Sequence, residues 1–183
     1  MARYLPLVLL VAFVAGGTVL LLNISPEALV ARVGPENAYL LLFGLAFVSG
    51  LSLFGATPYH LVVVTLALGG MNPWLLGLTA ASAVMAGDSV SYALGYQGQA
   101  VVPPRMRSAA QRLYHFLRRF PRLVPAFFFV YGAVAPFSND LVGVTMGVAR
   151  YPFVRVMVPL AFGNLVFNIA LAFLAEPALQ WLS

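Results

Sequence analysis

Two apolar stretches of this chain are each interrupted by proline and polar residues. The first interruption covers residues 55–60 and contains Pro58, and the second covers 132–140 and contains Pro136. A glycine follows eleven residues after each proline, and a Pro-aromatic pair and a second apolar run come next. Because proline lacks a backbone donor and blocks helix continuation, each stretch is expected to divide into two half-length helices. The repetition predicts an internal duplication whose halves meet at a polar site.

The composition indicates a membrane protein. The sequence is 62% hydrophobic and 8% charged, whereas soluble domains contain about 25% charged residues. Its 183 residues are expected to form a single membrane domain, and the absence of cysteine excludes disulfides, thiolate metal sites and cysteine nucleophiles. The net charge of +5 comes from arginine alone. Most of the arginines occupy one loop between apolar segments, which is a topology signal and argues against nucleic-acid binding.

The N-terminal region, residues 1–36, is predicted to contain a first membrane helix and an external segment. Residues 5–22 form an uninterrupted apolar run, long enough to cross a hydrocarbon core of roughly 30 Å. A signal peptide also begins in this way, but its apolar core is usually shorter and ends at a small-residue cleavage site. Ser25 and Pro26 have the pattern of a helix N-cap and first helical residue. We therefore expect a retained helix with a cytoplasmic N-terminus.

Residues 37–98 are predicted to form the first hairpin-plus-helix repeat. The residues beyond Pro58 and up to 70 cover only about half a bilayer at 1.5 Å per residue. The hairpin is therefore expected to enter the membrane, turn near Pro58 and leave on the side from which it came. A full span over 74–96 follows, with Trp74 and Tyr96 as interfacial anchors.

An arginine-rich loop, residues 99–122, joins the two repeats and is predicted to be cytoplasmic. It holds six of the ten arginines and no acid. Its helical part, 106–120, places Leu113, Phe116, Leu117 and Phe120 on one face, which is expected to lie on anionic lipid. The arginines expected to contact lipid headgroups and fix the orientation are Arg105, Arg107, Arg112, Arg118, Arg119, Arg122, Arg150 and Arg155.

The second repeat, 123–175, is predicted to run in the opposite orientation and to be followed by a tail, 176–183. Its hairpin enters over 123–135, turns over 136–140 and returns over 141–149, and a last span covers 153–175. The expected fold is an all-α integral membrane protein: an inverted-topology repeat of a re-entrant helical hairpin plus a transmembrane helix, preceded by one N-terminal transmembrane helix. The alternative is six complete spans, with helices running straight through Pro58 and Pro136.

Residues 87–98 resemble the G-D-x-x-x-Y-x-x-G-x-x-G segment of the DedA or VTT-domain (SNARE-associated) family of membrane proteins. Residues 135–140, followed by Met146-Gly147, Arg150, Pro152, Arg155 and Gly163, resemble the second hairpin and following helix of that family. The resemblance covers about residues 40–170. It implies a lipid carrier or scramblase-like transporter in a prokaryotic plasma membrane, since bacterial relatives are implicated in returning undecaprenyl phosphate and eukaryotic relatives scramble phospholipids. Several bacterial members depend on the proton motive force.

The sequence departs from this family at charged positions. The family typically carries acids in the first hairpin and two arginines around the proline of the second. Here Ser49 and His60 lie near the expected acid positions, and Ala133 and Asn139 lie near the expected arginines. Neither turn therefore offers a guanidinium group to a phosphate. Backbone amides at the starts of half-helices are the remaining candidates for binding an anion.

The candidate substrate or proton pathway consists of polar and flanking residues of the two turns and the helices that follow. Asp88 is expected to be a proton site or gate, or to make a structural hydrogen bond to the opposing hairpin. Asp140 is either an ion or proton site or the N-cap of the returning half-helix, and His60 is either a proton relay or a hydrogen-bonded histidine in a wet vestibule. The full set is Pro58, Tyr59, His60, Asp88, Tyr92, Pro136, Ser138, Asn139, Asp140 and Asn164.

The leading functional hypothesis is a transporter that moves a lipid or lipid phosphate between leaflets, with proton coupling as one form of it. The alternative is a non-transporting membrane scaffold or assembly factor that retains the fold. An intramembrane hydrolase using Asp88, His60 and Asp140 ranks last, because the sequence has no nucleophile elbow, zinc motif or phosphate-binding loop. We expect no enzyme activity, no cofactor and no metal. The expected partners are membrane lipids, lipid phosphate and protons, and a homo-oligomer is compatible with the sequence.

Overall fold

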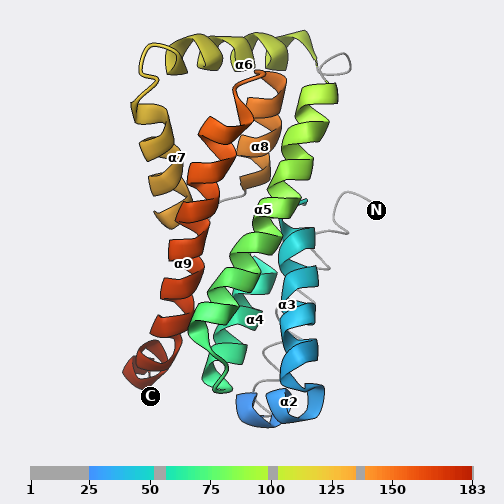
Figure 1. Cartoon of the computed structure of the whole chain (residues 1–183), viewed down its shortest axis with the longest axis vertical. Coiled ribbons are helices and arrows are strands. Elements are labelled where there is room, and N and C mark those ends of the chain that lie inside the picture. Colours follow the sequence, from blue (N-terminus) through green and yellow to red (C-terminus); the bar gives the residue numbers. More distant parts are fainter. Residues whose placement is uncertain (1–24, 52–56, 99–102, 135–138, 183) are drawn as a thin grey trace.

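The computed structural model describes residues 25–51, 57–98, 103–134 and 139–182, and within these ranges it is all-helical, with no strand (Figure 1). The helices are α2 (Pro26–Val33), α3 (Pro35–Ser49), α4 (Thr57–Leu68), α5 (Pro73–Gln97), α6 (Pro104–Leu117), α7 (Leu123–Val134), α8 (Asn139–Val148) and α9 (Phe153–Leu182). The helix predicted over 5–22 lies outside the described residues. The all-α class predicted from the sequence is confirmed.

Local capping signals fix the starts of two helices. The Ser25 hydroxyl accepts a hydrogen bond from the backbone N–H of Ala28 at 3.3 Å, and Pro26 is the first residue of α2, as predicted. A backbone N–H and the Ser25 side chain also lower the pKa of Glu27 below its usual value. Asn72 caps α5, since its side-chain oxygen accepts from the N–H of Trp74 at 2.9 Å. These polar residues therefore determine where each helix begins.

Helices α3 to α5 and α7 to α9 form two units of the same design, each with two short helices followed by a long one (Figure 1). The first short helix packs mainly on the long helix of its own unit, α3 on α5 and α7 on α9. The second short helix packs mainly on the long helix of the other unit, α4 on α9 and α8 on α5. Because the two long helices also pack on each other, this exchange joins both units in one core.

The turns that end the two hairpins have the same hydrogen-bond pattern. The N–H of Met71 donates to Leu66 O at 3.1 Å, and the N–H of Tyr151 donates to Met146 O at 3.0 Å. The residue before each donor has a positive φ, 80° at Gly70 and 54° at Arg150. When Met71 is aligned with Tyr151 on this pattern, Asn72 rather than Pro73 corresponds to Pro152. The two Pro-aromatic pairs seen in the sequence are therefore offset by one residue between the two units.

Paired glycines allow the first short helix of each unit to cross its long helix at backbone distance. A Cβ added at Gly87 would lie 2.6 Å from Phe47 O and 2.8 Å from the Cα of Gly50. At the second crossing, a Cβ added at Gly132 would lie 2.6 Å from Leu160 O, and one at Gly163 would meet the backbone of α7. Gly87 and Gly163 thus allow close helix packing, and Gly147 packs on α5 in the same way.

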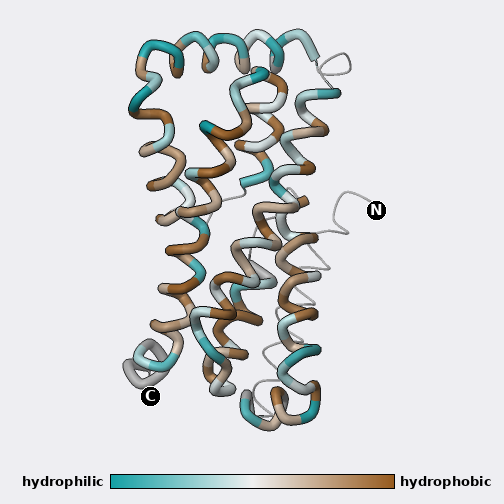
Figure 2. Tube along the Cα trace, viewed as in Figure 1, coloured by the Kyte–Doolittle hydropathy of each residue, from teal (hydrophilic) through white to brown (hydrophobic). Residues whose placement is uncertain are grey.

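Large apolar side chains remain exposed on the outer faces of the long and short helices. They include Leu40 on α3, Leu94 on α5, Val134 on α7 and Phe162 on α9, each more than half exposed. Much of the hydrophilic colour in Figure 2 lies at the two ends of the molecule, on α6 and around α2. Among the described helices, one segment, Phe153–Pro177, is long and apolar enough to cross a membrane, and Tyr59–Leu68 and Leu123–Val134 are apolar but shorter.

Some helix boundaries differ from those predicted. Helix α9 continues to Leu182, through Glu176 and Pro177, where the sequence predicted a tail. Helix α8 begins at Asn139, so Asp140 lies in its first turn and is not its N-cap. Local sequence signals predicted the positions of both helices. A hydropathy pattern does not show whether a helix continues beyond its apolar residues.

Helix α6 lies across one end of the molecule, over α7 and α8 (Figure 1). Its apolar face, predicted to lie on lipid, is directed in part toward the protein, because Leu117 is buried in the same core cluster as Phe128 and Tyr151. Phe116 on that face is 57% exposed. The helix was predicted to continue to 120, but α6 ends at Leu117, so Phe120 lies beyond it and is 49% exposed. One part of this apolar face therefore packs on the protein, and the other part is exposed.

We expect Gly87→Ala and Gly163→Ala each to destabilise the protein by about 1–3 kcal/mol, because the new methyl group meets the backbone of the crossing helix. Gly44→Ala is the matched control, since a Cβ at Gly44 has no neighbour within 4 Å. Thermal unfolding of the three variants in detergent, followed by size-exclusion chromatography, measures the difference. Equal stability of all three would contradict the tight crossings.

Candidate functional site

A cluster of polar side chains is buried where α4 and α8 begin. Its most buried members are Asp88 on α5, Asp140 on α8, and Asn164 and Asn168 on α9, each at most 5% exposed. They come from three helices that are distant in the sequence but pack together. Since burying a polar group without a partner is costly, such a cluster in an otherwise apolar interior marks a candidate site.

Asp88 lies at the point where three helices approach one another. It follows Gly87, at which α3 crosses α5, and its carbonyl oxygen lies 3.0 Å from a Cβ added at Gly143 of α8. Asp140 and Asn139 are near enough to interact with its carboxyl group electrostatically, but neither contact has hydrogen-bond geometry. Both Asp88 oxygens are thus buried without a hydrogen bond from the described residues. The carboxyl group is therefore available to a proton or a ligand.

Asparagine side chains join the start of α8 to α9. The side-chain amide of Asn139 donates to Asn164 Oδ1 at 3.1 Å, and that of Asn168 donates to the backbone oxygen of Asn164 at 2.8 Å. The remaining amide group of Asn164 and the oxygens of Asn139 and Asn168 are buried and unpartnered. This chain of amides extends the polar cluster by one helical turn along α9.

The first turn of α4 brings Tyr59 and His60 to the same cluster. The Tyr59 side chain is 3% exposed and lies beside Asn168, with Asp88 near enough for an electrostatic interaction. The His60 ring lies 4.2 Å from that of Tyr59 and 5.2 Å from that of Phe167, measured between centroids. Its Nε2 atom is buried without a hydrogen-bond partner. The starts of α4 and α8 therefore approach the same part of α9.

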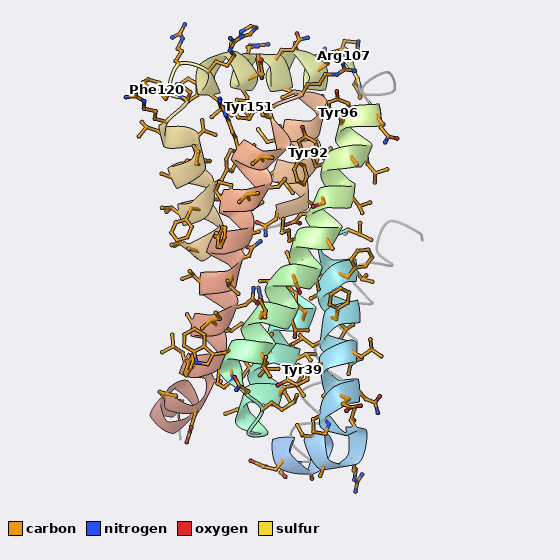
Figure 3. The ribbon with its side chains drawn as sticks, viewed as in Figure 1. Tyr39, Tyr92, Tyr96, Arg107, Phe120 and Tyr151 are labelled. Carbon is orange, nitrogen blue, oxygen red and sulfur yellow. The ribbon has the colours of Figure 1, made fainter. Side chains whose placement is uncertain are left out.

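Not every residue predicted for the pathway belongs to this cluster. The Tyr92 hydroxyl donates to the backbone oxygen of Tyr151 at 2.6 Å and ties α5 to the α8–α9 turn, near the α6 end (Figure 3). Tyr92 thus lies apart from the buried cluster, and its predicted pathway role stays a prediction. Pro58 lies in the first turn of α4, while Pro136 and Ser138 lie outside the described residues.

The arginines singled out in the sequence lie away from the buried cluster. Arg105, Arg118, Arg119 and Arg122 are exposed on or beside α6, and the Arg150 guanidinium lies 4.8 Å above the Tyr96 ring. The set also includes Arg107, which lies on α6, and two exposed residues, Arg112 and Arg155. The exposed arginines of this set are therefore not part of the buried cluster.

Two members of the cluster were not singled out from the sequence. Asn168 lies four residues after Asn164, and this spacing places both on one helix face, a signal that could have found it. Tyr131 on α7 lies near enough to Asp88 for an electrostatic interaction. Nothing in its sequence context distinguishes it from the other aromatic residues of α7.

The arrangement suits proton transfer better than metal or phosphate binding. No group of three or more His, Cys, Asp or Glu residues in the described ranges could hold a metal ion. Two carboxyl groups in one buried site repel each other when both are charged, so Asp88 and Asp140 are suited to share a proton. Amide, phenol and imidazole groups surround the pair with further donors and acceptors.

No family model, no curated protein and no solved structure matches this chain. The resemblance to the DedA or VTT-domain proteins therefore remains an interpretation of sequence motifs.

The contact between α8 and α9 can be tested in this cysteine-free chain. We expect Asn139→Cys and Asn164→Cys, introduced together, to be joined by a short thiol-specific bifunctional reagent, because the native side chains lie within hydrogen-bond distance. Asn37→Cys with Asn164→Cys is the control pair, since Asn37 is exposed near the α2 end. Cross-linking is measured by protease digestion and mass spectrometry. Equal yields from both pairs would contradict the contact.

Proposed function

We propose that this protein is an integral membrane transporter that moves a lipid or lipid phosphate between leaflets, with Asp88 and Asp140 as its proton site. The observation that carries the proposal is the pair of buried carboxyl groups at the meeting point of two half-length helices. Ionisable groups inside membrane segments are expensive and usually mark ion or proton pathways. The resemblance to a family of lipid transporters agrees with this assignment.

The distribution of apolar side chains supports a membrane location. The exposed apolar residues on α3, α5, α7 and α9 would face hydrocarbon, and the polar ends at α6 and α2 would face the two headgroup regions (Figure 2). The 25 residues of α5 correspond to about 37 Å at 1.5 Å per residue, enough to cross the hydrocarbon core. Its buried residues, which include Gly77, Gly87 and Asp88, face the packed interior rather than lipid.

The arrangement of the two units supports an inverted repeat. Helix α3 runs inward from the α2 end and α7 runs inward from the α6 end, so the hairpins would enter the membrane from opposite sides (Figure 1). Helices α4 and α8 contain only 12 and 10 residues, which suits half a membrane each. The arginines on and beside α6 would place that end in the cytoplasm. The polar cluster would then lie near mid-depth, where alternating access needs its binding site.

The geometry gives little support to a hydrolase. The ring neighbours of His60 are Tyr59 and Phe167, and no hydrogen bond joins it to Asp88 or Asp140 among the described residues. A general base needs to lie within hydrogen-bond reach of its nucleophile. The non-transporting scaffold remains the alternative to be tested by reconstitution.

Reconstitution into lipid vesicles tests the transporter assignment. We expect the protein to accelerate leaflet exchange of a fluorescent lipid phosphate under a pH gradient. Asp88→Asn and Asp140→Asn should each slow lipid exchange by about tenfold or more. A tenfold reduction corresponds to an increase of about 1.4 kcal/mol in the activation barrier. Ser82→Ala is the matched control on α5, because Ser82 is exposed and bonds only within its own helix.

Exchange equal to that of empty vesicles, with and without the gradient, would contradict transport and favour the scaffold. Unchanged rates in both aspartate variants, recovered folded, would remove the carboxyl pair from the mechanism.

A further inference from the structure

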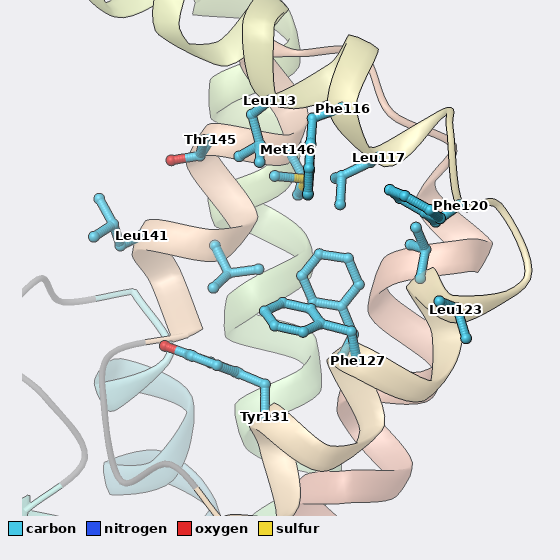
Figure 4. Close-up of a pocket in the computed structure, with 13 residues that line it drawn as sticks. Leu113, Phe116, Leu117, Phe120, Leu123, Phe127, Tyr131, Leu141, Thr145 and Met146 are labelled. Atoms are coloured by element: carbon cyan, nitrogen blue, oxygen red, sulfur yellow. The ribbon is translucent and has the colours of Figure 1, made fainter.

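An apolar cavity of about 480 Å³ lies beneath α6, between α7 and α8 (Figure 4). Thirteen side chains line it, and only Tyr131 and Thr145 among them carry a hydroxyl group. The volume lies within the roughly 300–1,000 Å³ of typical ligand pockets. Its lining offers almost no hydrogen bonds, so a hydrocarbon group is the chemistry that it would accept.

The cavity separates the two limbs of the second hairpin. Helices α3 and α4 of the first hairpin pack on each other, whereas α7 and α8 make at most isolated contacts. Phe116 and Phe127 line the cavity and are 57% and 58% exposed, so the space is open at the molecular surface. In a membrane this surface would face hydrocarbon. A lipid chain could therefore enter from the side.

Positive charge borders the end of the cavity next to α6. Arg118, Arg119 and Arg122 are exposed and alternate in the sequence with lining residues such as Phe120. The segment from 105 to 122 contains no acid that could neutralise them. Guanidinium groups bind phosphate oxygens bidentately. This border is therefore complementary to an anionic headgroup.

The other end of the cavity approaches the buried cluster. Tyr131 lines the cavity and lies near enough to Asp88 for an electrostatic interaction (Figure 4). The cavity thus extends from the segment that carries the arginines to Tyr131. A chain bound in it would lie between these two polar regions.

A second copy of the protein fits the site less well. Glu27, Glu36 and Glu176, the acids outside the buried cluster, lie on α2, at the start of α3 and near the end of α9, away from α6 (Figure 1). A copy in the same membrane orientation would bring no negative charge to the arginines. A lipid supplies both the apolar chain and the anion.

We propose that the cavity between α6, α7 and α8 holds the hydrocarbon chain of a phosphate-headgroup lipid, with the phosphate on Arg118, Arg119 and Arg122. The choice of a lipid ligand rests on the proposed function. The binding itself needs no leaflet exchange, so the two proposals can fail separately.

Photolabelling of the purified full-length protein in detergent tests the site. The probe is lysophosphatidic acid with a photoreactive diazirine in its acyl chain, and mass spectrometry locates the labelled residues. We expect labelling of the cavity side chains of α6, α7 and α8. Val142→Phe, which fills the cavity, should reduce it about tenfold, equivalent to about 1.4 kcal/mol of binding. Thr145→Met is a second filling variant if Val142→Phe does not fold.

Two controls separate the chain from the headgroup. Ala161→Phe, in a smaller hollow between α5 and α9, should leave cavity labelling unchanged. Changing Arg118, Arg119 and Arg122 to Gln should weaken labelling by lysophosphatidic acid, and a monoacylglycerol with the same photoreactive chain should label the unaltered protein weakly.

Uniform labelling of all apolar surfaces, or equal labelling by the phosphate and neutral probes, would overturn the inference. Increased labelling after deletion of residues 1–22 would make that segment the occupant and would also overturn it. Specific cavity labelling without leaflet exchange would support this site and contradict the transporter.

Discussion

Two helices begin inside the molecule, and the rest of the structure depends on how their polar ends are accommodated. The first backbone N–H groups of α4 and α8 have no partner within their own helices. Both ends carry the positive part of the helix dipole toward the cluster that contains Asp88 and Asp140. The buried carboxyl group of Asp88, whose oxygens have no hydrogen-bond partner among the described residues, is better tolerated at such a place than in a uniformly apolar core. Under the proposed function, protonation of the carboxyl pair would change the charge that these helix ends face.

Backbone packing holds these ends in position. The crossings at Gly50 and Gly87 and at Gly132 and Gly163 bring α3 against α5 and α7 against α9 without intervening side chains. Each long helix then supports the second short helix of the other unit. Asp88 follows one of the crossing glycines and Asn164 follows another, so the residues that allow close packing are adjacent to those that form the site.

Most of the helical framework could be predicted from the sequence because its signals are local. Ser25 and Asn72 mark helix starts, Pro58 marks the start of a half-length helix, and Gly87 and Gly163 mark close approaches. The separation of α7 from α8 and the cavity between them depend on packing over many residues, which no local pattern encodes. Tyr92 was assigned to the site from a motif, but its hydroxyl is engaged by the Tyr151 carbonyl in a turn 59 residues away. The proximity of Tyr131 to Asp88 is likewise visible only in the folded chain, where α5 and α7 both pack on α9.

The proposed account separates two tasks within one small membrane protein. The arginines of α6 and the cavity beneath them would hold a lipid, and the buried carboxyl pair would carry the proton. The most direct measurement follows lipid exchange and internal pH together in the same vesicles. The account predicts that protons enter in a fixed ratio to the lipid moved and that Asp88→Asn abolishes both movements. Lipid exchange that continues at an unchanged rate in Asp88→Asn, without proton entry, would contradict it.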